Sequence, residues 1–407
     1  MNTGVAPVGA AGSRMEVKEA CASYVVEAGL RAPKGYKQTE VGVIPEDWEV
    51  IALGMVCTLH NGRAYALHEW ETSGIPVIRL QNLTGGDDYY YSKLNLPDEK
   101  YCSQGDLLYM WSATFGPRIW TGDRAIYHYH IWKVTPHPTK AKADFLFHKL
   151  GDITLEKKTR AANGGTMLHV TKGDMEATLI SLPTKAEQQA IAEALSDADA
   201  LIESLEQLLA KKRQIKQGAM QELLTGKKRL PGFGGEWEIC RLGEVAPLQR
   251  GFDLPNPQLQ QGPYPVVYSN GILYHHIEYQ VKGPGVVTGR SGTIGTVTFV
   301  EQNFWPHNTS LWVTSFKGND PKFVYYLFTR IGLDRFATGS GVPTLNRNDV
   351  HAFKVGMPPT KAEQTAIATL LSDMDTELAA LETKLAKARQ IKQGMMQELL
   401  TGRIRLV

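Results

Sequence analysis

PTKAEQQAIAEALSDADALIESLEQLLAKKRQIKQGAMQELLTGKKRL, residues 183–230, occurs a second time in this chain of 407 residues. The second copy, residues 359–406, is PTKAEQTAIATLLSDMDTELAALETKLAKARQIKQGMMQELLTGRIRL. The copies align without a gap at an offset of 176 residues, and 33 of their 48 paired positions are identical. One long repeat excludes a solenoid, which needs several short ones, and indicates a duplicated unit of one domain followed by one helix.

Each copy has the pattern of a long amphipathic helix. Thr184 and Thr360 each have a glutamate three residues later, which is the spacing of a capping box, so the glutamate is expected to reach back to the cap. Apolar residues then recur at intervals of three and four, and such a narrow stripe needs a partner helix to bury it. The simplest partner for one copy is the other. The residues expected to pair are Ile191, Leu195, Ile202, Leu205, Leu209, Ile367, Leu371, Leu378, Leu381 and Leu385.

The copies also agree at positions outside the apolar stripe. KxRQIKQG recurs at 211–218 and 387–394, and QELLTG recurs at 221–226 and 397–402, where the last glycine is a candidate C-cap. A helical hairpin with no role beyond packing would tolerate change at such solvated positions. Their retention favours two like partners that dock on two like sites.

The composition limits the class of protein. Hydrophobic residues make up 43%, which is ordinary for a soluble globular chain, and no apolar run approaches the roughly 18 residues of a membrane span. No signal peptide is visible, and four cysteines without C-x-x-C spacing favour a reducing compartment and no structural zinc. With a net charge of only +2, a nucleic-acid binder must concentrate its positive charge locally or borrow it from a partner.

The rest of the chain forms two β-rich heads. Segments such as PVIRLQNL and IYHYHIWKV in the first, and PYPVVYSN and GTVTFV in the second, alternate with glycine-rich turns. The opening DWEVIALG at 47–54 is echoed by EWEICRLG at 236–243. We therefore expect an α+β fold divided into an N-terminal lead with a short helix (1–34), a first head (35–182), a first long spacer helix (183–230), a second head (231–357) and a second long spacer helix (358–407).

Several phrases together resemble the specificity subunit of a type I restriction-modification system. They are GYKQTEVGVIPEDW at 35–48, PTKAEQxAIA after each head, the doubled LLTG, GRSGTIG at 289–295, HNTSL at 307–311 and GVPTLN at 341–346. The likeness covers about residues 35–407. In the first head WSATFG (111–116) stands where the second has 289–295, and MLH (167–169) stands where it has TLN (344–346).

This resemblance implies a division of labour. Two target recognition domains would each bind one half of a bipartite double-stranded DNA site, and an antiparallel pair of long helices would set the gap between the halves. Two methyltransferase (M) subunits would dock around the helices, and restriction (R) subunits could join. N6-adenine methylation with S-adenosylmethionine and cleavage driven by ATP and Mg would belong to those partners, so this chain would bind no cofactor and work in the prokaryotic cytoplasm.

The chain lacks the motifs of that chemistry. It has no Asn-Pro-Pro-Tyr or Asp-Pro-Pro-Tyr phrase and no G-x-x-x-x-G-K-[ST] phosphate loop. His275-His276 and His128-x-His130 lack acidic or thiol partners at ligand spacing, so we expect no metal site. Two other hypotheses remain open at this point: an enzyme in its own right, and a protein-binding coiled-coil adaptor without direct DNA readout.

The candidate DNA contacts are loop residues with forked donors or amides for base edges, and hydroxyls or cations for phosphates. Arg118 and Arg290 are the strongest candidates for direct contact. The full set is Asn61, Arg63, Gln81, Asn82, Lys93, Thr114 and Arg118 in the first head, and Arg250, Asn270, Arg290, Thr293, Asn308, Thr344 and Asn346 in the second.

Overall fold

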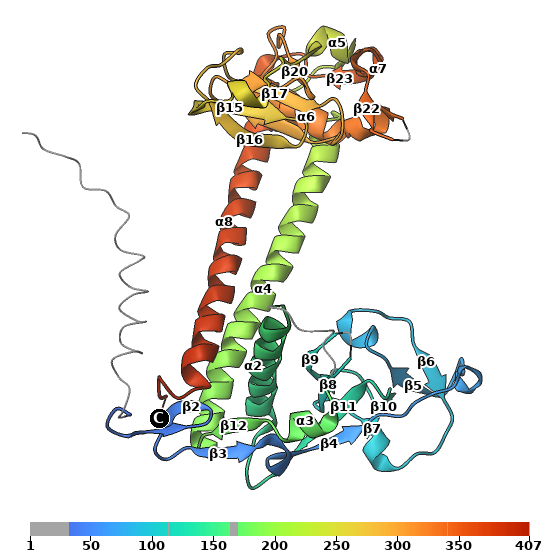
Figure 1. Ribbon diagram of the computed structural model, residues 1–407. Helices are drawn as coiled ribbons and strands as arrows, with labels where there is room; N and C mark the ends of the chain where they lie inside the picture. The colour runs from blue at the N-terminus through green and yellow to red at the C-terminus, as the bar shows by residue number, and fades with distance from the viewer. Residues whose placement is uncertain (1–31, 113, 163–169, 340, 407) are drawn as a thin grey trace, which may run out of the picture. The chain divides into compact units, whose positions relative to one another are not determined.

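The computed structural model describes residues 32–112, 114–162, 170–339 and 341–406 (Figure 1). The chain divides into two compact units, Met1–Ile202 with Lys387–Val407, and Glu203–Ala386. Each unit holds one head and one portion of each long helix, α4 (Lys185–Leu223) and α8 (Lys361–Leu399). The short helix expected within residues 1–34 lies outside the described residues. No helix in the described part of the chain is long and apolar enough to cross a membrane.

The first head is built from small sheets, with α2 packed beside them. Its four-stranded sheets have the orders β4-β11-β8-β9 and β6-β5-β10-β7, and β1-β2 and β12-β3 form two-stranded sheets. The elements are β1 Tyr36–Thr39, β2 Gly42–Pro45, β3 Glu49–Ala52, η1 Leu53–Met55, β4 Cys57–Asn61, η2 Leu67–Glu69, β5 Ile75–Ile78, η3 Asn82–Thr84, β6 Tyr90–Ser92, η4 Asp98–Lys100, β7 Tyr101–Cys102, β8 Leu107–Met110, β9 Gly116–Ile119, β10 Ala125–Tyr127, β11 Ile131–Pro136, α2 Ala143–Ala162, α3 Lys172–Glu176 and β12 Leu179–Leu182.

The second head repeats this plan with fewer strands. Its sheets have the orders β14-β20-β17-β18, β16-β15-β19, β13-β23 and β21-β22. The elements are β13 Glu238–Arg241, α5 Leu242–Val245, β14 Leu248–Arg250, η5 Asn256–Gln258, β15 Gln261–Tyr268, β16 Gly271–His276, β17 Gly285–Gly289, β18 Val297–Val300, β19 Trp305–Pro306, β20 Ser310–Val313, α6 Pro321–Ile331, η6 Leu333–Phe336, β21 Ala337–Thr338, β22 Thr344–Leu345, α7 Arg347–Ala352 and β23 Lys354–Met357. The α+β class with two β-rich heads and two long helices is therefore as predicted.

The long helices run antiparallel within each unit. In the second unit Lys216 of α4 forms an ion pair with Asp375 of α8, and Arg213 forms one with Glu382 at 2.6 Å, so later residues of α4 meet earlier residues of α8. In the first unit Lys392 pairs with Asp199. Both lysines belong to the retained KxRQIKQG phrase. Part of that retention is therefore explained by contacts inside the chain, and docking of partners at this phrase stays a prediction.

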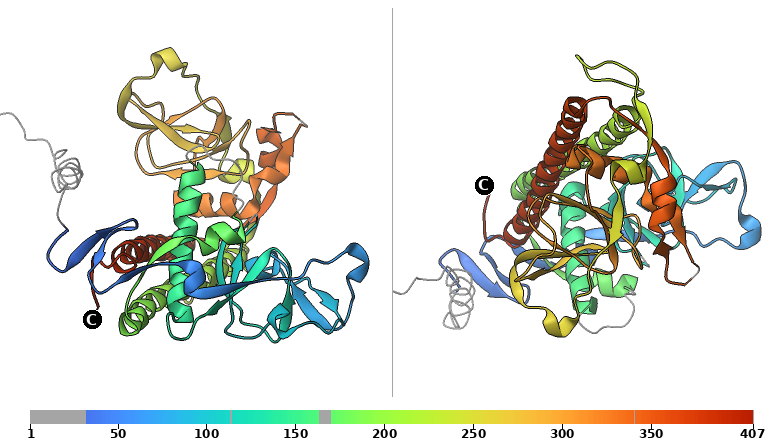
Figure 2. Two further views of the ribbon diagram at one scale, coloured as in Figure 1. Left: turned by 60° about the horizontal axis from the view of Figure 1, so that its bottom comes forward. Right: turned by 90° about the horizontal axis from the view of Figure 1, so that it is seen from above.

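The ends of the long helices are also buried in the cores of the heads. Ile191 and Leu195 lie in one apolar cluster with α2 residues and with Leu399 and Leu400, and α2 lies beside α4 and the end of α8 in Figure 2. Ile367 and Leu371 lie in the core of the second head. Of the other residues expected to pair, Leu205, Leu209 and Leu385 are buried, and Ile202, Leu378 and Leu381 are half-buried. The apolar stripe therefore serves the heads at its ends as well as the partner helix.

The N-terminal end of each long helix is held by specific contacts. The backbone N–H groups of Glu187 and Glu363 donate to the hydroxyls of Thr184 and Thr360 at 3.4 and 3.3 Å. Their carboxylates, however, do not reach back to the cap, so the second half of the expected capping box is wrong. Each carboxylate instead accepts from an arginine, Arg405 and Arg229 respectively, because a guanidinium offers two charge-assisted donors where the cap offers one amide.

Glycines follow the C-terminal ends of both long helices in the left-handed region, as predicted. Gly226 and Gly402 have φ of +71° and +72°. A Cβ on Gly226 would lie 2.9 Å from the Trp237 ring, and one on Gly402 would lie 2.5 Å from Pro45. Each glycine therefore permits both the left-handed turn at the helix end and the close packing of the first residues of a head against it.

Candidate nucleic-acid interface

Three loops of the second head are tied together at one edge of its main sheet. The turn after β14 is held against the turn before β20 by bonds from the Gly251 N–H to the Ser310 carbonyl, 3.0 Å, and from the Phe252 N–H to the Pro306 carbonyl, 2.8 Å. The β17–β18 loop joins them, since the Arg290 N–H donates to the Thr309 carbonyl at 2.9 Å. We call the β14 turn, the β17–β18 loop and the β19–β20 turn the reading loops of the second head.

Two further segments border these loops. The Leu345 N–H donates to the Arg290 carbonyl at 2.8 Å, which brings β22 alongside. A Cβ on Gly289 would lie 1.8 Å from the Thr293 carbonyl and 2.9 Å from that of Ser269, so the β15–β16 turn is also close and only glycine fits there. The structure therefore brings together six of the predicted contacts, namely Arg250, Asn270, Arg290, Thr293, Asn308 and Thr344. The seventh, Asn346, is used as the N-cap of α7, where its side chain accepts from the Asn348 N–H at 3.0 Å.

The first head ties the equivalent three loops in the same way. The Gly62 N–H donates to the Ile131 carbonyl at 3.1 Å, and the Trp111 N–H donates to the His130 carbonyl at 3.2 Å. The β4 turn, the β8–β9 loop and the β10–β11 turn are thus the reading loops of the first head, and they carry Asn61, Arg63 and Thr114.

Strand register supports the expected equivalence of 111–116 and 289–295. Met110 is paired with Gly116 across the β8–β9 loop, and Thr288 is paired with Val297 across the β17–β18 loop. The other expected equivalence, of 167–169 with 344–346, lies outside the described residues.

The reading loops of the two heads differ in chemistry. In the first head the Trp111 ring stacks on Trp132 at 5.7 Å and meets the edge of His130 at 5.3 Å, and Tyr129 is 39% exposed. Burial, together with the nearby His130 and Arg79, lowers the pKa of His128 to about 4, so this imidazole is neutral at physiological pH. The first head therefore presents rings where the second presents Arg290, Asn308 and Thr309.

The remaining predicted residues of the first head have mixed surroundings. Asn82 is buried, and its amide makes three hydrogen bonds inside the loop from Arg79 to Asp88, which is a structural use. Gln81 donates to the Asp88 carbonyl at 3.3 Å, and Arg118 on edge strand β9 donates to the Leu83 carbonyl at 3.4 Å, so both lie by η3. Lys93 pairs with Glu71 at 2.9 Å.

Sequence reasoning missed two residues of this surface. Asp253 accepts hydrogen bonds from Arg250 and Asn308, and Arg79 lies 4.2 Å from the centroid of the Tyr90 ring, over its face. The Arg-x-x-Asp spacing at 250–253 was a usable signal for the first. The second depends on a contact between separate strands, which leaves no local pattern.

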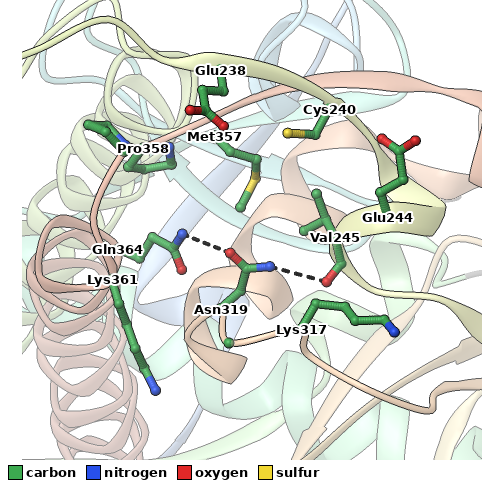
Figure 3. Close-up of a pocket in the computed structure, with 12 residues that line it drawn as sticks. Glu238, Cys240, Glu244, Val245, Lys317, Asn319, Met357, Pro358, Lys361 and Gln364 are labelled. Atoms are coloured by element: carbon green, nitrogen blue, oxygen red, sulfur yellow. Dashed lines mark hydrogen bonds between the residues drawn. The ribbon is translucent and has the colours of Figure 1, made fainter.

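A cavity of about 310 Å³ in the second head is distinct from the reading loops (Figure 3). It is lined by β13, α5, the 317–319 turn and the start of α8, and carries Glu238, Glu244, Lys317 and Lys361. Asn319 is fixed there by bonds with Gln364, 2.9 Å, and with the Val245 carbonyl, 3.2 Å. None of the predicted DNA contacts lines it, and its mixed charge does not suit a phosphate backbone. Among the described residues no group of three or more histidine, cysteine or acidic side chains could hold a metal ion.

Comparison with known proteins agrees with this architecture. The family model described as Type I restriction modification DNA specificity domain matches residues 45–216 and 234–392. The chain is 26% identical to the type I restriction enzyme MjaVIII specificity subunit of Methanocaldococcus jannaschii, over 89% of this chain and 94% of that protein. It is 23% identical to the putative MjaX specificity subunit of the same organism, over 92% and 97%.

Solved structures share the fold. The chain matches the crystal structure of a type I restriction-modification system S subunit from M. genitalium with a TM-score of 0.61 and 15% identity, covering 91% of this chain and 98% of that one. Two family matches, one on each head with part of the helix that follows it, cover most of the sequence and decide for a DNA specificity domain over a protein-binding coiled-coil adaptor. The chain belongs to the type I restriction modification DNA specificity domain family and is the non-catalytic DNA specificity subunit, with two target recognition domains, of a type I restriction-modification system.

Proposed function

We propose that each head contacts one half of a bipartite DNA target through its three reading loops. The observation that carries this proposal is that both heads tie the same three loops with the same backbone bonds while presenting different side chains. A shared frame with unlike side chains suits two domains that bind different base sequences in similar orientations. The domain boundaries 35–182 and 231–357 are part of this proposal. So are the predicted DNA contacts on the reading loops and on the segments beside them, except Asn82 and Asn346, whose amides serve their own turn and helix cap.

The test is the methylated motif in the genome of cells that express this chain with its methyltransferase partner. A split motif is expected, and replacing the 289–293 segment by the loop of a relative should change one half and leave the other intact. Salt-dependent DNA binding of the assembled complex should weaken when Arg118 and Arg290 are replaced by alanine. An unsplit motif, or one in which both halves change together, would contradict the proposal.

We infer that two methyltransferase subunits dock on the equivalent exposed faces of the long helices. Ile215 and Ile391 are 47% and 52% exposed although they are aliphatic and retained in both copies. Gly218 and Gly394 lie one turn further on, and a Cβ added to either would meet no atom within 4 Å, so each leaves open space beside the exposed isoleucine. An apolar side chain next to a helical glycine allows close approach of another chain.

This docking is testable by stoichiometry. Replacing Ile215 or Ile391 singly by glutamate should reduce the complex from two methyltransferase subunits to one in native mass spectrometry, and the double replacement should abolish it. A double variant that still binds two subunits would refute these sites. The reaction would use S-adenosylmethionine, ATP and Mg on the partner subunits, with restriction subunits joining the same assembly in the cytoplasm where the DNA is.

A further inference from the structure

Arg250 and Asn308, which lie far apart in sequence, donate to the same atom in the second head. The Arg250 guanidinium is 3.0 Å from Asp253 Oδ1, and the Asn308 amide nitrogen donates to that same oxygen. Two donors on one acceptor lie within about 6 Å of each other, and neighbouring base pairs are separated by about 3.4 Å. The pair is therefore close enough to contact two adjacent bases.

The backbone beneath this group is fixed. The Gly251 and Phe252 N–H groups bond to the Ser310 and Pro306 carbonyls, and a Cβ on Gly251 would lie 2.3 Å from the His307 carbonyl. Arg250 and Asp253 therefore stand on one turn that is bonded directly to the turn carrying Asn308. Side chains on such a frame keep their positions before DNA arrives, and preorganisation of this kind favours selectivity.

The hydrogen bonds to Asp253 leave donors and acceptors of Arg250 and Asn308 available for contacts with bases. An asparagine amide has two N–H groups and one carbonyl, so donation of one N–H to Asp253 leaves the other N–H and Oδ1 for adenine N7 and N6. Arg250 donates one of its five N–H groups and keeps a fork for guanine O6 and N7. The side chains of Arg250 and Asp253 are 51% and 65% exposed, so the group is accessible from solvent.

We propose that Asp253 is a positioning residue that holds Arg250 and Asn308 as a pair reading a guanine and a neighbouring adenine in the half-site bound by the second head. The proposal rests on the proposed function of the reading loops and adds their base preference. In the first head the equivalent positions are Asn61, Ala64 and Tyr129, so that head has no such pair and its half-site serves as an internal control.

The experiment uses the complex of the full chain with its methyltransferase subunit and duplexes that carry the motif found by methylation sequencing. Replacing one adenine of the half-site by 7-deazaadenine removes its N7, and this should weaken the wild-type complex about tenfold at a single position. The N308A complex should be insensitive to that replacement, and R250A should lose preference at the neighbouring guanine.

The Asp253→Ala variant tests whether Asp253 positions the two reading side chains or only supports the fold. It should reduce discrimination at those two positions by about five- to a hundredfold. It should also raise affinity for DNA without the motif, because one negative charge is removed from the proposed DNA-contacting surface. Asp253→Asn, whose carbonyl can still accept both donors, should recover part of the discrimination.

Two results would overturn the inference. One is an N308A complex that still depends on N7 of an adenine in that half-site as the wild type does. The other is a D253A complex that weakens equally on all sequences, including those that vary only in the first half-site. Absence of any split motif would instead count against the proposed function itself, so the two failures are distinguishable.

Discussion

Arg405 and Glu187 form a two-pronged ion pair across 218 residues of sequence in the first unit. The Glu187 carboxylate is fully buried and also accepts from the Trp48 indole at 2.8 Å, while Arg405 bonds to Asp47 at 2.9 Å. The equivalent pair in the second unit is Arg229 with Glu363, but the indole nitrogen of Trp237 has no hydrogen-bond partner there. The two units therefore share one ion pair and differ in the tryptophan bond and in the second carboxylate, Asp47, that Arg405 engages.

This difference predicts unequal costs for matched substitutions. Glu187→Ala and Glu363→Ala each remove a buried carboxylate from its arginine, which should cost about 2–4 kcal/mol of unfolding free energy. Arg405 then keeps Asp47, while Arg229 keeps only backbone carbonyls. E187A should exceed E363A by about 1–2 kcal/mol, because it also strands the buried Trp48 donor. Hydrogen–deuterium exchange of the two units measures each loss separately, and equal losses would contradict the assignment.

The buried His148 predicts that acid destabilises the first unit. Burial lowers its pKa to about 4, against an ordinary value of 6.5, and the neutral ring lies 3.2 Å from the Ser196 hydroxyl. The unfolded chain therefore binds a proton that the folded chain does not, so stability should fall as the pH drops from about 6.5 to about 4.

The second unit supplies the control. There Tyr326 lies 3.2 Å from the Ser372 hydroxyl and stays neutral, since burial raises its pKa. H148Y should reduce the sensitivity of the first unit, to which His128 with its lowered pKa also contributes, and Y326H should increase that of the second, where burial already lowers the pKa of His307 and His351. Denaturant unfolding at a series of pH values between 4 and 7 checks both, and a slope unaffected by H148Y would exclude His148 as its source.

The helical glycines predict opposite effects on stability and assembly. Gly218→Ala and Gly394→Ala should each stabilise the isolated chain by about 0.5–1 kcal/mol, because open space surrounds both positions. If methyltransferase subunits approach there, the same variants should weaken assembly, as native mass spectrometry would register. G402A is the contrasting variant, since its Cβ would meet Pro45 and should destabilise the chain. Stabilisation with unchanged assembly would place the docking surface elsewhere.

Replacing Lys149 should loosen the segment at the end of α8. Its buried ammonium donates to the Leu400 carbonyl at 3.2 Å and to the Ser181 hydroxyl at 3.4 Å, and burial lowers its pKa. K149A should cost about 2–4 kcal/mol and speed tryptic cleavage after Arg403. K149M should cost less stability than K149A. The equivalent position in the second unit is Leu327, next to Tyr326, and it is buried and apolar, so an apolar side chain suits this site. Cleavage at the wild-type rate in K149A would show that other contacts hold the segment.

The length of the long helices predicts the spacing of the DNA target. Deleting one heptad from both α4 and α8 shortens each by about 10 Å, close to three base pairs. The spacer in the methylated motif should shrink by about that amount while both halves keep their sequence. An unchanged spacer would remove the idea that these helices act as a ruler.

The sequence was sufficient for the fold where the signal was local and repeated. The capping threonines, the apolar stripe and the C-terminal glycines each have a fixed spacing, and all appear in the structure. It failed for the carboxylates of Glu187 and Glu363, because the competing donors, Arg405 and Arg229, come from distant segments. It also missed the ion pairs of Lys216 and Lys392, since their acidic partners lie on the other helix.

Prediction of the reading surface was uneven for a similar reason. Residue type and loop position selected six residues that the second head gathers in one place. The same criteria also selected Asn82, whose amide is used inside its own loop, and Asn346, which caps a helix. An amide suits a base edge and a backbone turn equally well, so only the fold distinguishes the two uses.

The burial of Leu399 and Leu400 in the core of the first head has a consequence for biosynthesis. These residues are translated after the residues of both heads. The first head is therefore translated first but completes its hydrophobic core last. Until Leu399 and Leu400 pack there, apolar surface of that head is exposed to other nascent chains.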